Sequence, residues 1–226
     1  MEEANIKTEI EVIEPSFIIE TELDGGKILE SLEKFGRVSH KSEDKISLGT
    51  AKEFIKKLLE WGHESILEHI SITVRIICDR GVTHELVRHR NAAYTQESTR
   101  YCNYSGKIQF INPLFFKPGS SEYSIWLKGC EHAAEQYTKL INMGSKPEEA
   151  RSVLPNSLKT EIIVTCNLRE WRHIFKMRCS SAAHPQIRQI MVPLLQEFQK
   201  RIPVIFDDFD VREIESTYPL VATKKQ

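Results

Sequence analysis

The stretch Arg88–Tyr101, which reads RHRNAAYTQESTRY, carries an unusual density of side chains suited to binding and chemistry. Two arginines flank a histidine at its start, seven residues then separate Arg90 from Ser98, and Arg100 follows closely. Guanidinium groups bind phosphate or carboxylate through paired hydrogen bonds. Three of them beside several hydroxyl groups predict a site for a polyanionic ligand, although a charge cluster alone is more often a solvated surface.

The chain of 226 residues is long enough to bury a sizeable core, and it suits one domain spanning residues 1–226. Its 31 basic and 32 acidic side chains leave a formal net charge of −1. A strongly basic surface for nucleic acid is therefore not expected, and any anion site must be local. A local site suits a small phosphorylated ligand better than a duplex.

The first residues, MEEANIKTEIEVIEPSF, are acidic and lack the apolar core of a signal peptide. No apolar run approaches the length of a bilayer, so no membrane partner is expected. The five cysteines are odd in number and form no CxxC pair. This usage indicates reduced thiols and a cytoplasmic location.

Hydrophobic periodicity predicts the elements of the N-terminal half. Apolar residues alternate in two segments that we interpret as strands, and they recur at helical spacing in two others. The segment that follows the RHR triplet has no clean period and is expected to be a ligand-binding loop. The expected elements are a strand at 9–21 ended by Asp24-Gly25-Gly26, a helix at 50–61, a strand at 69–78, a short helix at 81–90 and a loop at 91–104.

The C-terminal half is predicted to be more helical, and strands and helices alternate irregularly along the whole chain, which predicts an α+β fold. Gly144 is expected to end a long helix, and the tail 218–226 is expected to fray. Arg172 is expected on a solvated helix face. The three tryptophans, Trp61, Trp126 and Trp171, are expected in the core or at an interface. The expected elements are helices at 123–143, from 146, at 168–177 and at 185–200, with a strand at 158–166.

Several familiar motifs are absent. There is no GxGxxG and no Walker-type glycine loop, so Arg side chains and helix N-termini must hold any bound nucleotide. His63-Glu64 begins like an HExxH zinc helix, but Leu67 stands where the second histidine belongs, so no metal site is predicted. Cys102 follows Arg100 and could be an activated nucleophile, although a packed or incidental cysteine is the commoner case.

The RHR triplet followed by seven residues and Ser98 resembles the defining motif of the flavin-dependent thymidylate synthase family. Further blocks occur in the family's order between about Arg37 and Gln186. Each block is weak alone, but the ordered set is highly specific. The blocks are Arg37-Val38-Ser39, Gly62-His63-Glu64-Ser65 with Glu68-His69, Glu85-Leu86-Val87, Arg151 to Pro155, Asn167-Leu168-Arg169 with His173 and Arg178, and His184-Pro185-Gln186.

The resemblance implies a site for FAD and a site for dUMP. It also implies that Arg178, His63 and Ser98 are catalytic, with Arg178 stabilising the ionised N3/O2 edge of the uracil ring. The residues implied to bind FAD are Ser39, Ser65, Arg88, His89, Arg90, Gln96, Asn167, Arg169 and His173. Those implied to bind dUMP are Glu85, Leu86, Val87, Arg88, Gln96, Glu97, Ser98, Thr99, Arg100, Arg151 and Arg178.

The reaction implied by the resemblance is the reductive methylation of dUMP to dTMP, a step of nucleotide biosynthesis. NADPH reduces FAD, methylenetetrahydrofolate donates the carbon, and tetrahydrofolate leaves unoxidised. The implied fold is a single α+β domain with a mixed or antiparallel sheet packed against helices. The implied assembly is a homotetramer whose active sites are shared between subunits.

The chain departs from the family pattern in three places: Thr95-Gln96 replaces Asn-Glu, His173 replaces Asn, and Pro185, Ile187 and Arg188 replace Ala, Trp and Glu. Gln96 cannot act as a carboxylate base. Other classes of function stay open at this point: a flavin or NADPH reductase on the same scaffold, a nucleotide-binding regulatory protein, and an RNA-binding module that uses the RHR loop.

Overall fold

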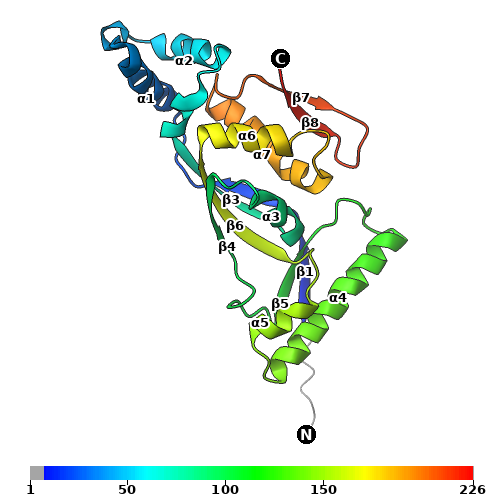
Figure 1. Ribbon diagram of the computed structural model, residues 1–226. Coiled ribbons are helices and arrows are strands. Elements are labelled where there is room, and N and C mark those ends of the chain that lie inside the picture. Colours follow the sequence, from blue (N-terminus) through cyan, green and yellow to red (C-terminus); the bar gives the residue numbers. More distant parts are fainter. Residues whose placement is uncertain (1–7, 226) are drawn as a thin grey trace. The chain divides into compact units, whose positions relative to one another are not determined.

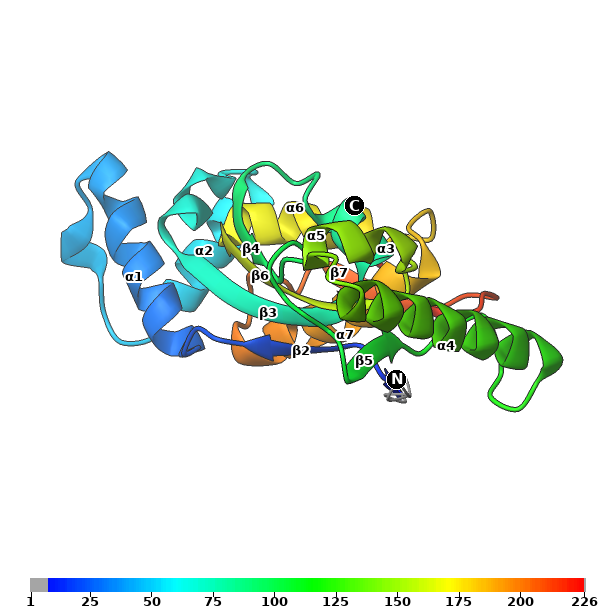
Figure 2. The same ribbon diagram turned by 90° about the horizontal axis from the view of Figure 1, so that it is seen from below.

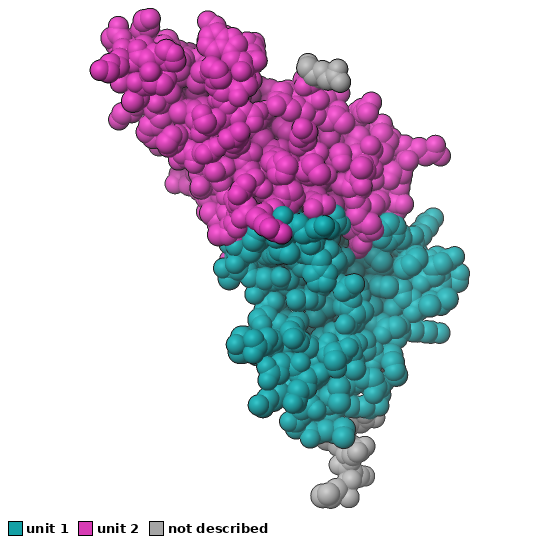
Figure 3. Space-filling model, in the orientation of Figure 1, with its two compact units in different colours: residues 1–16, 76–88, 94–163 teal, residues 17–75, 89–93, 164–226 magenta. Residues whose placement is uncertain are grey.

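The computed structural model describes residues 8–225, which form two compact units, coloured separately in Figure 3. Unit 1 contains the residues up to 16 together with 76–88 and 94–163, and unit 2 contains 17–75, 89–93 and the residues from 164 onward. The prediction of one domain over residues 1–226 stays a prediction, and its two ends, residues 1–7 and 226, lie outside the described part.

A four-stranded sheet contributes residues to both units, because its two inner strands, β3 and β6, each begin in one unit and end in the other. Both strands show alternate burial, as expected where one face of a sheet is covered. The strands, in spatial order, are β2 (Ser16–Ile19), β3 (Ser71–Asp79), β6 (Lys159–Asn167) and β4 (Ala92–Gln96).

In unit 1, two parallel strands pack against one long helix (Figure 1). Ile108 and Phe110 of β5 share a buried cluster with Ala134 and Tyr137 of α4. The helix begins where the Ser120 hydroxyl accepts a hydrogen bond from the Tyr123 backbone N–H. The elements of this unit are β1 (Glu9–Ile13), α3 (Arg80–Leu86), β5 (Lys107–Ile111), α4 (Ser121–Asn142), α5 (Pro147–Ala150) and the 3-10 helix η4 (Arg151–Val153).

In unit 2, helices α6 and α7 lie side by side (Figure 1), and aromatic rings fill the space between them. Trp171 and Phe175 of α6 meet Phe198 of α7 and Phe206, with ring centroids 5.3–5.7 Å apart. The helices of this unit are α1 (Gly25–Arg37), η1 (Val38–His40), η2 (Glu43–Lys45), α2 (Thr50–Glu60), η3 (Glu64–His69), α6 (Leu168–Arg178) and α7 (Pro185–Arg201), and its hairpin is β7 (Phe209–Glu213) with β8 (Leu220–Lys224).

The α+β prediction is confirmed, with a parallel pair β1–β5 and an antiparallel pair β7–β8 in the same chain. The predicted elements at 50–61, 69–78, 123–143, 158–166, 168–177 and 185–200 all occur, with ends shifted by one or two residues. The predicted strand at 9–21 is split into β1 and β2, because Pro15 has no N–H to continue a ladder.

Three predictions are wrong. Asp24-Gly25-Gly26 does not end an element: the Asp24 side chain accepts the Lys27 N–H and begins α1, which packs against α2 (Figure 2). Residues 92–96 form strand β4 rather than a loop. Within the expected frayed tail, Leu220–Lys224 pair with β7, and Val221 and Ala222 are buried, because this strand completes a hairpin.

No helix within residues 8–225 is long and apolar enough to cross a membrane.

Candidate active site

The RHR triplet follows Val87, the C-cap of helix α3, and so lies outside the helix that was expected to reach residue 90. Its residues divide between the two units. Arg88 belongs to unit 1, whereas His89 and Arg90 belong to unit 2. The candidate residues therefore form two sets, which we name by their unit. The unit 1 set is Glu85, Leu86, Val87, Arg88, Gln96, Glu97, Ser98, Thr99, Arg100 and Arg151. The unit 2 set is Ser39, His63, Ser65, His89, Arg90, Asn167, Arg169, His173 and Arg178.

The unit 1 set contains a tight turn after β4 that gathers hydroxyl and guanidinium groups. The Arg100 backbone N–H donates to Ser98 Oγ at 3.2 Å, and the Cys102 N–H donates to the Ser98 carbonyl at 3.0 Å. An Arg151 guanidinium nitrogen donates to Thr99 Oγ1 at 3.1 Å. Arg100 is exposed and pairs with Glu148 at 3.4 Å. These contacts bring Ser98, the buried Thr99 and the exposed Arg151 together.

Other members of the unit 1 set are held by the protein itself. The Gln96 amide donates to Thr83 and Thr160 at 3.1 and 3.3 Å. Glu97 accepts from Tyr104 and Lys159 at 2.7 and 3.1 Å, one on each carboxylate oxygen. Burial raises the pKa of Tyr104, and the hydrogen bond to Glu97 and the charge of that carboxylate raise it further. The phenol therefore keeps its proton and stays a donor. The Leu86 side chain is fully buried, which leaves only its backbone to face a ligand.

The unit 2 set centres on helix α6, whose N-cap is Asn167. The Asn167 side chain accepts the Glu170 backbone N–H at 2.9 Å and caps the helix. Arg169 and His173 are four residues apart and therefore share one helix face, where Arg169 pairs with Glu68. This face borders a cavity of about 780 Å³ lined by Glu64, Glu68, Asn91, Asn167, Arg169, Glu170, Arg172, His173, Lys176, Phe209 and Lys224.

His89 and Arg178 form the best-defined contact between candidate residues. Arg178 Nε donates to His89 Nε2 at 2.9 Å, and the His89 ring is 5.5 Å from the His173 ring. His89 is buried, and its Nδ1 lies 3.6 Å from a Glu170 carboxylate oxygen. Burial, together with the charges of Arg178 and His173, lowers the pKa of His89 to about 4. The imidazole is therefore neutral at physiological pH.

Within the described residues, His89, Glu170 and His173 place possible ligand atoms within 4.8 Å of one another. A metal there would need a lone pair from His89. Because Arg178 donates to Nε2, the neutral ring carries its proton on Nδ1, and neither nitrogen offers a free lone pair. The expectation of no metal site stays a prediction, and the geometry at His89 supports it.

Six members of the unit 2 set do not line the cavity: Ser39, His63, Ser65, His89, Arg90 and Arg178. Ser39 Oγ donates to the Gly36 carbonyl at 2.9 Å and contacts His40. His63 is exposed, and its ring centroid is 6.0 Å from that of Trp61. Trp61 itself is 66% exposed, whereas Trp171 is fully buried as expected.

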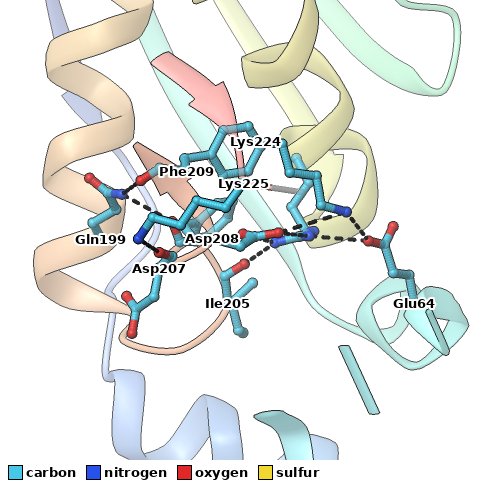
Figure 4. A network of polar contacts seen from close by, with 10 residues as sticks. Glu64, Gln199, Ile205, Asp207, Asp208, Phe209, Lys224 and Lys225 are labelled. Atoms are coloured by element: carbon cyan, nitrogen blue, oxygen red, sulfur yellow. Dashed lines mark hydrogen bonds and ion pairs between the residues drawn. The ribbon is translucent and has the colours of Figure 1, made fainter. Parts of the chain in front are cut away.

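The prediction that Arg172 lies on a solvated helix face is wrong. It is 4% exposed and donates two hydrogen bonds to the Asp208 carboxylate, at 2.8 and 2.6 Å. It also donates to Glu64 at 3.1 Å and to the Ile205 carbonyl. Figure 4 shows Glu64, Asp208 and Lys224 directed toward one another; Lys224 lies 3.1 Å from Glu64.

Sequence patterns missed several cavity residues. Lys176 follows Arg169 by seven residues and His173 by three, so the helical period alone indicates that it shares their face. Glu170 also lines the cavity, and no motif in the sequence points to it. Phe209 and Lys224 come from the C-terminal hairpin, which carried no recognisable motif.

Comparison with known proteins shows which family the chain belongs to. The family model described as thymidylate synthase complementing protein matches residues 27–204. A flavin-dependent thymidylate synthase from Pyrococcus furiosus is 39% identical over 171 residues, which cover 74% of this chain and 70% of the relative. The chain belongs to the flavin-dependent thymidylate synthase family.

Two further comparisons give a similar picture. The flavin-dependent thymidylate synthase of Geobacter sulfurreducens is 36% identical over 73% of this chain and 72% of the relative. The crystal structure of a UMP/dUMP methylase, PolB, from Streptomyces cacaoi shares the fold, with a TM-score of 0.71 at 24% identity over 88% of this chain and 95% of that one. The segment that the family model matches contains every candidate residue, whereas Phe209 and Lys224 lie beyond its end.

Proposed function

We propose that this chain is a methyltransferase that converts dUMP to dTMP, with FAD as cofactor, NADPH as reductant and methylenetetrahydrofolate as carbon donor. Family membership supports the reaction class. The main structural support for this site is the hydrogen bond from Arg178 to His89. Through it, the guanidinium at the end of α6 contacts the RHR segment.

The lining of the 780 Å³ cavity fits part of an anionic dinucleotide. Its volume is in the usual range for ligand pockets, about 300–1,000 Å³. Three exposed basic side chains, Arg169, Lys176 and Lys224, lie in this lining, whereas Arg172 is buried and paired with Asp208. Asn167, Arg169 and His173 would hold FAD there, with His89, Arg90, Ser39 and Ser65 as further contacts. When bound, FAD would pass on the hydride that completes the methyl group.

The turn after β4 fits the phosphate of dUMP. Ser98 offers a hydroxyl group, and Arg100 and Arg151 offer guanidinium groups on the same turn or within hydrogen-bond distance of it. Thr99 would take part through Arg151, because its buried hydroxyl accepts a hydrogen bond from that guanidinium. Charge-assisted bonds from Arg to phosphate are among the strongest hydrogen bonds in proteins. The proposed contacts to dUMP also include Glu85, Leu86, Val87, Arg88, Gln96 and Glu97.

Arg178 is the proposed electrostatic catalyst. Uracil C5 becomes nucleophilic when negative charge accumulates on the ring, and a guanidinium at N3/O2 stabilises that charge. His89 holds the Arg178 Nε through a neutral ring, which leaves the positive charge of the guanidinium uncompensated by this partner. Ser98 and His63 complete the proposed catalytic set, Ser98 beside the nucleotide and His63 at the start of η3.

A mechanism without a cysteine nucleophile agrees with the state of the thiols. Burial raises the pKa of Cys78, Cys130, Cys166 and Cys179, so these four thiols resist ionisation. Cys102 is partly exposed on the turn that contains Ser98. The five free cysteines also support the proposed cytoplasmic location. A homotetramer with shared active sites is part of the proposal through the family.

The test is an anaerobic incubation of the purified protein with FAD, NADPH, dUMP and methylenetetrahydrofolate, with dTMP measured by mass spectrometry. We expect dTMP that disappears when FAD is removed. Arg178→Ala should lower kcat by about 100- to 1,000-fold while FAD stays bound, since one such group contributes roughly 2.7–4 kcal/mol. NADPH consumption without any dTMP would refute the proposal and indicate a reductase.

A further inference from the structure

A buried carboxylate stands behind the contact between His89 and Arg178. Glu170 is 7% exposed, and one of its carboxylate oxygens is 3.6 Å from His89 Nδ1. His89 Nε2, on the other side of the ring, accepts from Arg178 Nε at 2.9 Å. The three groups form a chain of contacts from Glu170 through the imidazole to the guanidinium. Glu170 was not among the predicted site residues, and a carboxylate inside a protein needs a reason to be there.

We propose that Glu170 is a positioning residue that selects the Nδ1–H tautomer of His89 and thereby fixes the direction of the Arg178 guanidinium. The effect of Glu170 on catalysis rests on the function proposed above for Arg178. The effect of Glu170 on the His89 tautomer and on the Arg178 guanidinium does not rest on that function.

Donor and acceptor chemistry supports the tautomer. A guanidinium has only donors, so the nitrogen that receives the Arg178 N–H must carry a lone pair. That nitrogen is Nε2, and the proton of the neutral ring must therefore be on Nδ1. In the opposite tautomer an N–H would face the Arg178 N–H, and the contact would be lost. Which tautomer is populated thus decides whether Arg178 is held.

Glu170 favours the required tautomer by charge. At 3.6 Å its carboxylate is too far from Nδ1 for a good hydrogen bond, but it is close enough to attract the Nδ1–H dipole in a buried setting. The opposite tautomer would turn the Nδ1 lone pair toward the same carboxylate, which is unfavourable. A glutamine at this position carries no charge and can present either its carbonyl oxygen or its NH2 group to Nδ1, so it would not select one tautomer.

The local structure keeps both ends of this chain of contacts in place. The Glu170 backbone N–H donates to the Asn167 cap, so the residue lies in the first turn of α6. Arg178 is the last residue of the same helix. Trp171, next to Glu170, is fully buried and donates to the Ile72 carbonyl at 3.1 Å, which ties this end of α6 to β3. The imidazole therefore bridges two fixed points on one helix.

A metal site built on the same three side chains is the competing use of this cluster, and it conflicts with Arg178. Binding through Nε2 would require the guanidinium to leave, and binding through Nδ1 would require removal of its proton. The positive charge of Arg178 would also repel a cation. The contacts favour a positioning role.

The test compares Glu170→Gln with the wild type and with Glu30→Gln, an exposed glutamate of α1 in the same unit. Histidine tautomers are read by long-range ¹H–¹⁵N NMR on the FAD-loaded protein labelled at histidine, with His89→Gln to assign the His89 signals. In the wild type and in Glu30→Gln we expect an unprotonated Nε2 and a protonated Nδ1. In Glu170→Gln we expect a mixture of both tautomers, and Glu170→Asp should retain most of the wild-type pattern.

The kinetic readout is dTMP formation by the same variants. Loss of a carboxylate that orients a metal-ligating histidine commonly costs about 10- to 100-fold. By the same logic of orientation we expect a fall of about that size in kcat for Glu170→Gln, with the FAD dissociation constant changed less than about twofold. A wild-type Nε2–H tautomer, or an unchanged tautomer in Glu170→Gln, would overturn the proposal. So would a shifted tautomer with an unchanged kcat.

The two proposals fail separately. If the wild type forms no dTMP, the proposed function is wrong, but the tautomer still decides the role of Glu170. The Arg178 Nε–H signal then replaces kcat: it should shift or broaden in Glu170→Gln and stay in place in Glu30→Gln. An Arg178 signal identical in all three proteins would overturn the positioning role without any turnover.

Discussion

Replacing Asp208 with alanine should destabilise the protein strongly, because it removes the main partner of a buried cation. Arg172 is 4% exposed and gives Asp208 two hydrogen bonds, at 2.8 and 2.6 Å. Leaving a buried charge without its partner commonly costs about 3–5 kcal/mol. Glu64 remains 3.1 Å from Arg172, and Asp208 is itself partly exposed, so we expect about 3 kcal/mol, the lower end of that range.

The assay is thermal unfolding of the FAD-free protein at neutral pH. For a chain of this length, about 3 kcal/mol corresponds to a fall in Tm of roughly 6–12 °C. Asp210→Ala is the matched control, since Asp210 is an exposed aspartate of β7 two residues away. A Tm for Asp208→Ala that is within about 2 °C of the Asp210→Ala value would refute the reasoning, because it corresponds to less than about 1 kcal/mol.

A double variant separates the buried charge from lost packing. In Arg172→Met with Asp208→Ala, no buried cation remains without a partner, and Lys224 keeps its contact with Glu64. Replacing a buried ion pair with apolar groups is often neutral. We therefore expect the double variant to unfold at a higher temperature than Asp208→Ala alone. A lower temperature would show that packing by Arg172, rather than its charge, dominates.

Three further outcomes can be checked independently. The pKa of His89 is about 4 in the folded protein and 6.5 ordinarily, so between pH 7 and pH 5 the unfolded chain takes up a proton that the folded protein does not. His89 should therefore contribute a loss of about 2 kcal/mol of stability as the pH falls from 7 to 5, and His89→Gln should lose less. Equal losses in urea titrations would contradict this. Lys176→Glu reverses a charge on the cavity wall and should weaken FAD binding about tenfold at low salt and less at high salt, by fluorescence titration; equal weakening at both would point to misfolding. Cys102→Ser should keep kcat within about twofold, since a lost nucleophile would cost far more.

Much of the fold could be predicted because its periods are local. Helices α2 and α6 show apolar residues at helical spacing, and β3 alternates. Helix α1 was missed because Asp24-Gly25-Gly26 resembles a turn, whereas the Asp24 side chain caps a helix. The β7–β8 hairpin was missed because the segment carries many polar residues, and only its pairing buries Val221 and Ala222.

The candidate site was predictable to the extent that residues follow a known motif or a helix face. Arg178 and His89 were both indicated by the family resemblance, and they are in contact. The burial of Arg172 could not be anticipated, because its partners Asp208 and Glu64 are 36 and 108 residues away along the chain. The position of Glu170 behind His89 likewise depends on tertiary structure, since no local pattern distinguishes a buried glutamate from a solvated one.

The most direct test of the central claim is the oxidation state of the folate product. If FAD supplies the hydride, each dTMP should appear with one tetrahydrofolate and one oxidised NADPH, and the folate should leave unoxidised. The products of an anaerobic reaction can be separated by liquid chromatography and quantified by mass spectrometry. Tetrahydrofolate in equal amount to dTMP is the predicted result. Dihydrofolate in equal amount to dTMP would contradict the account, because the folate itself would then have supplied the hydride.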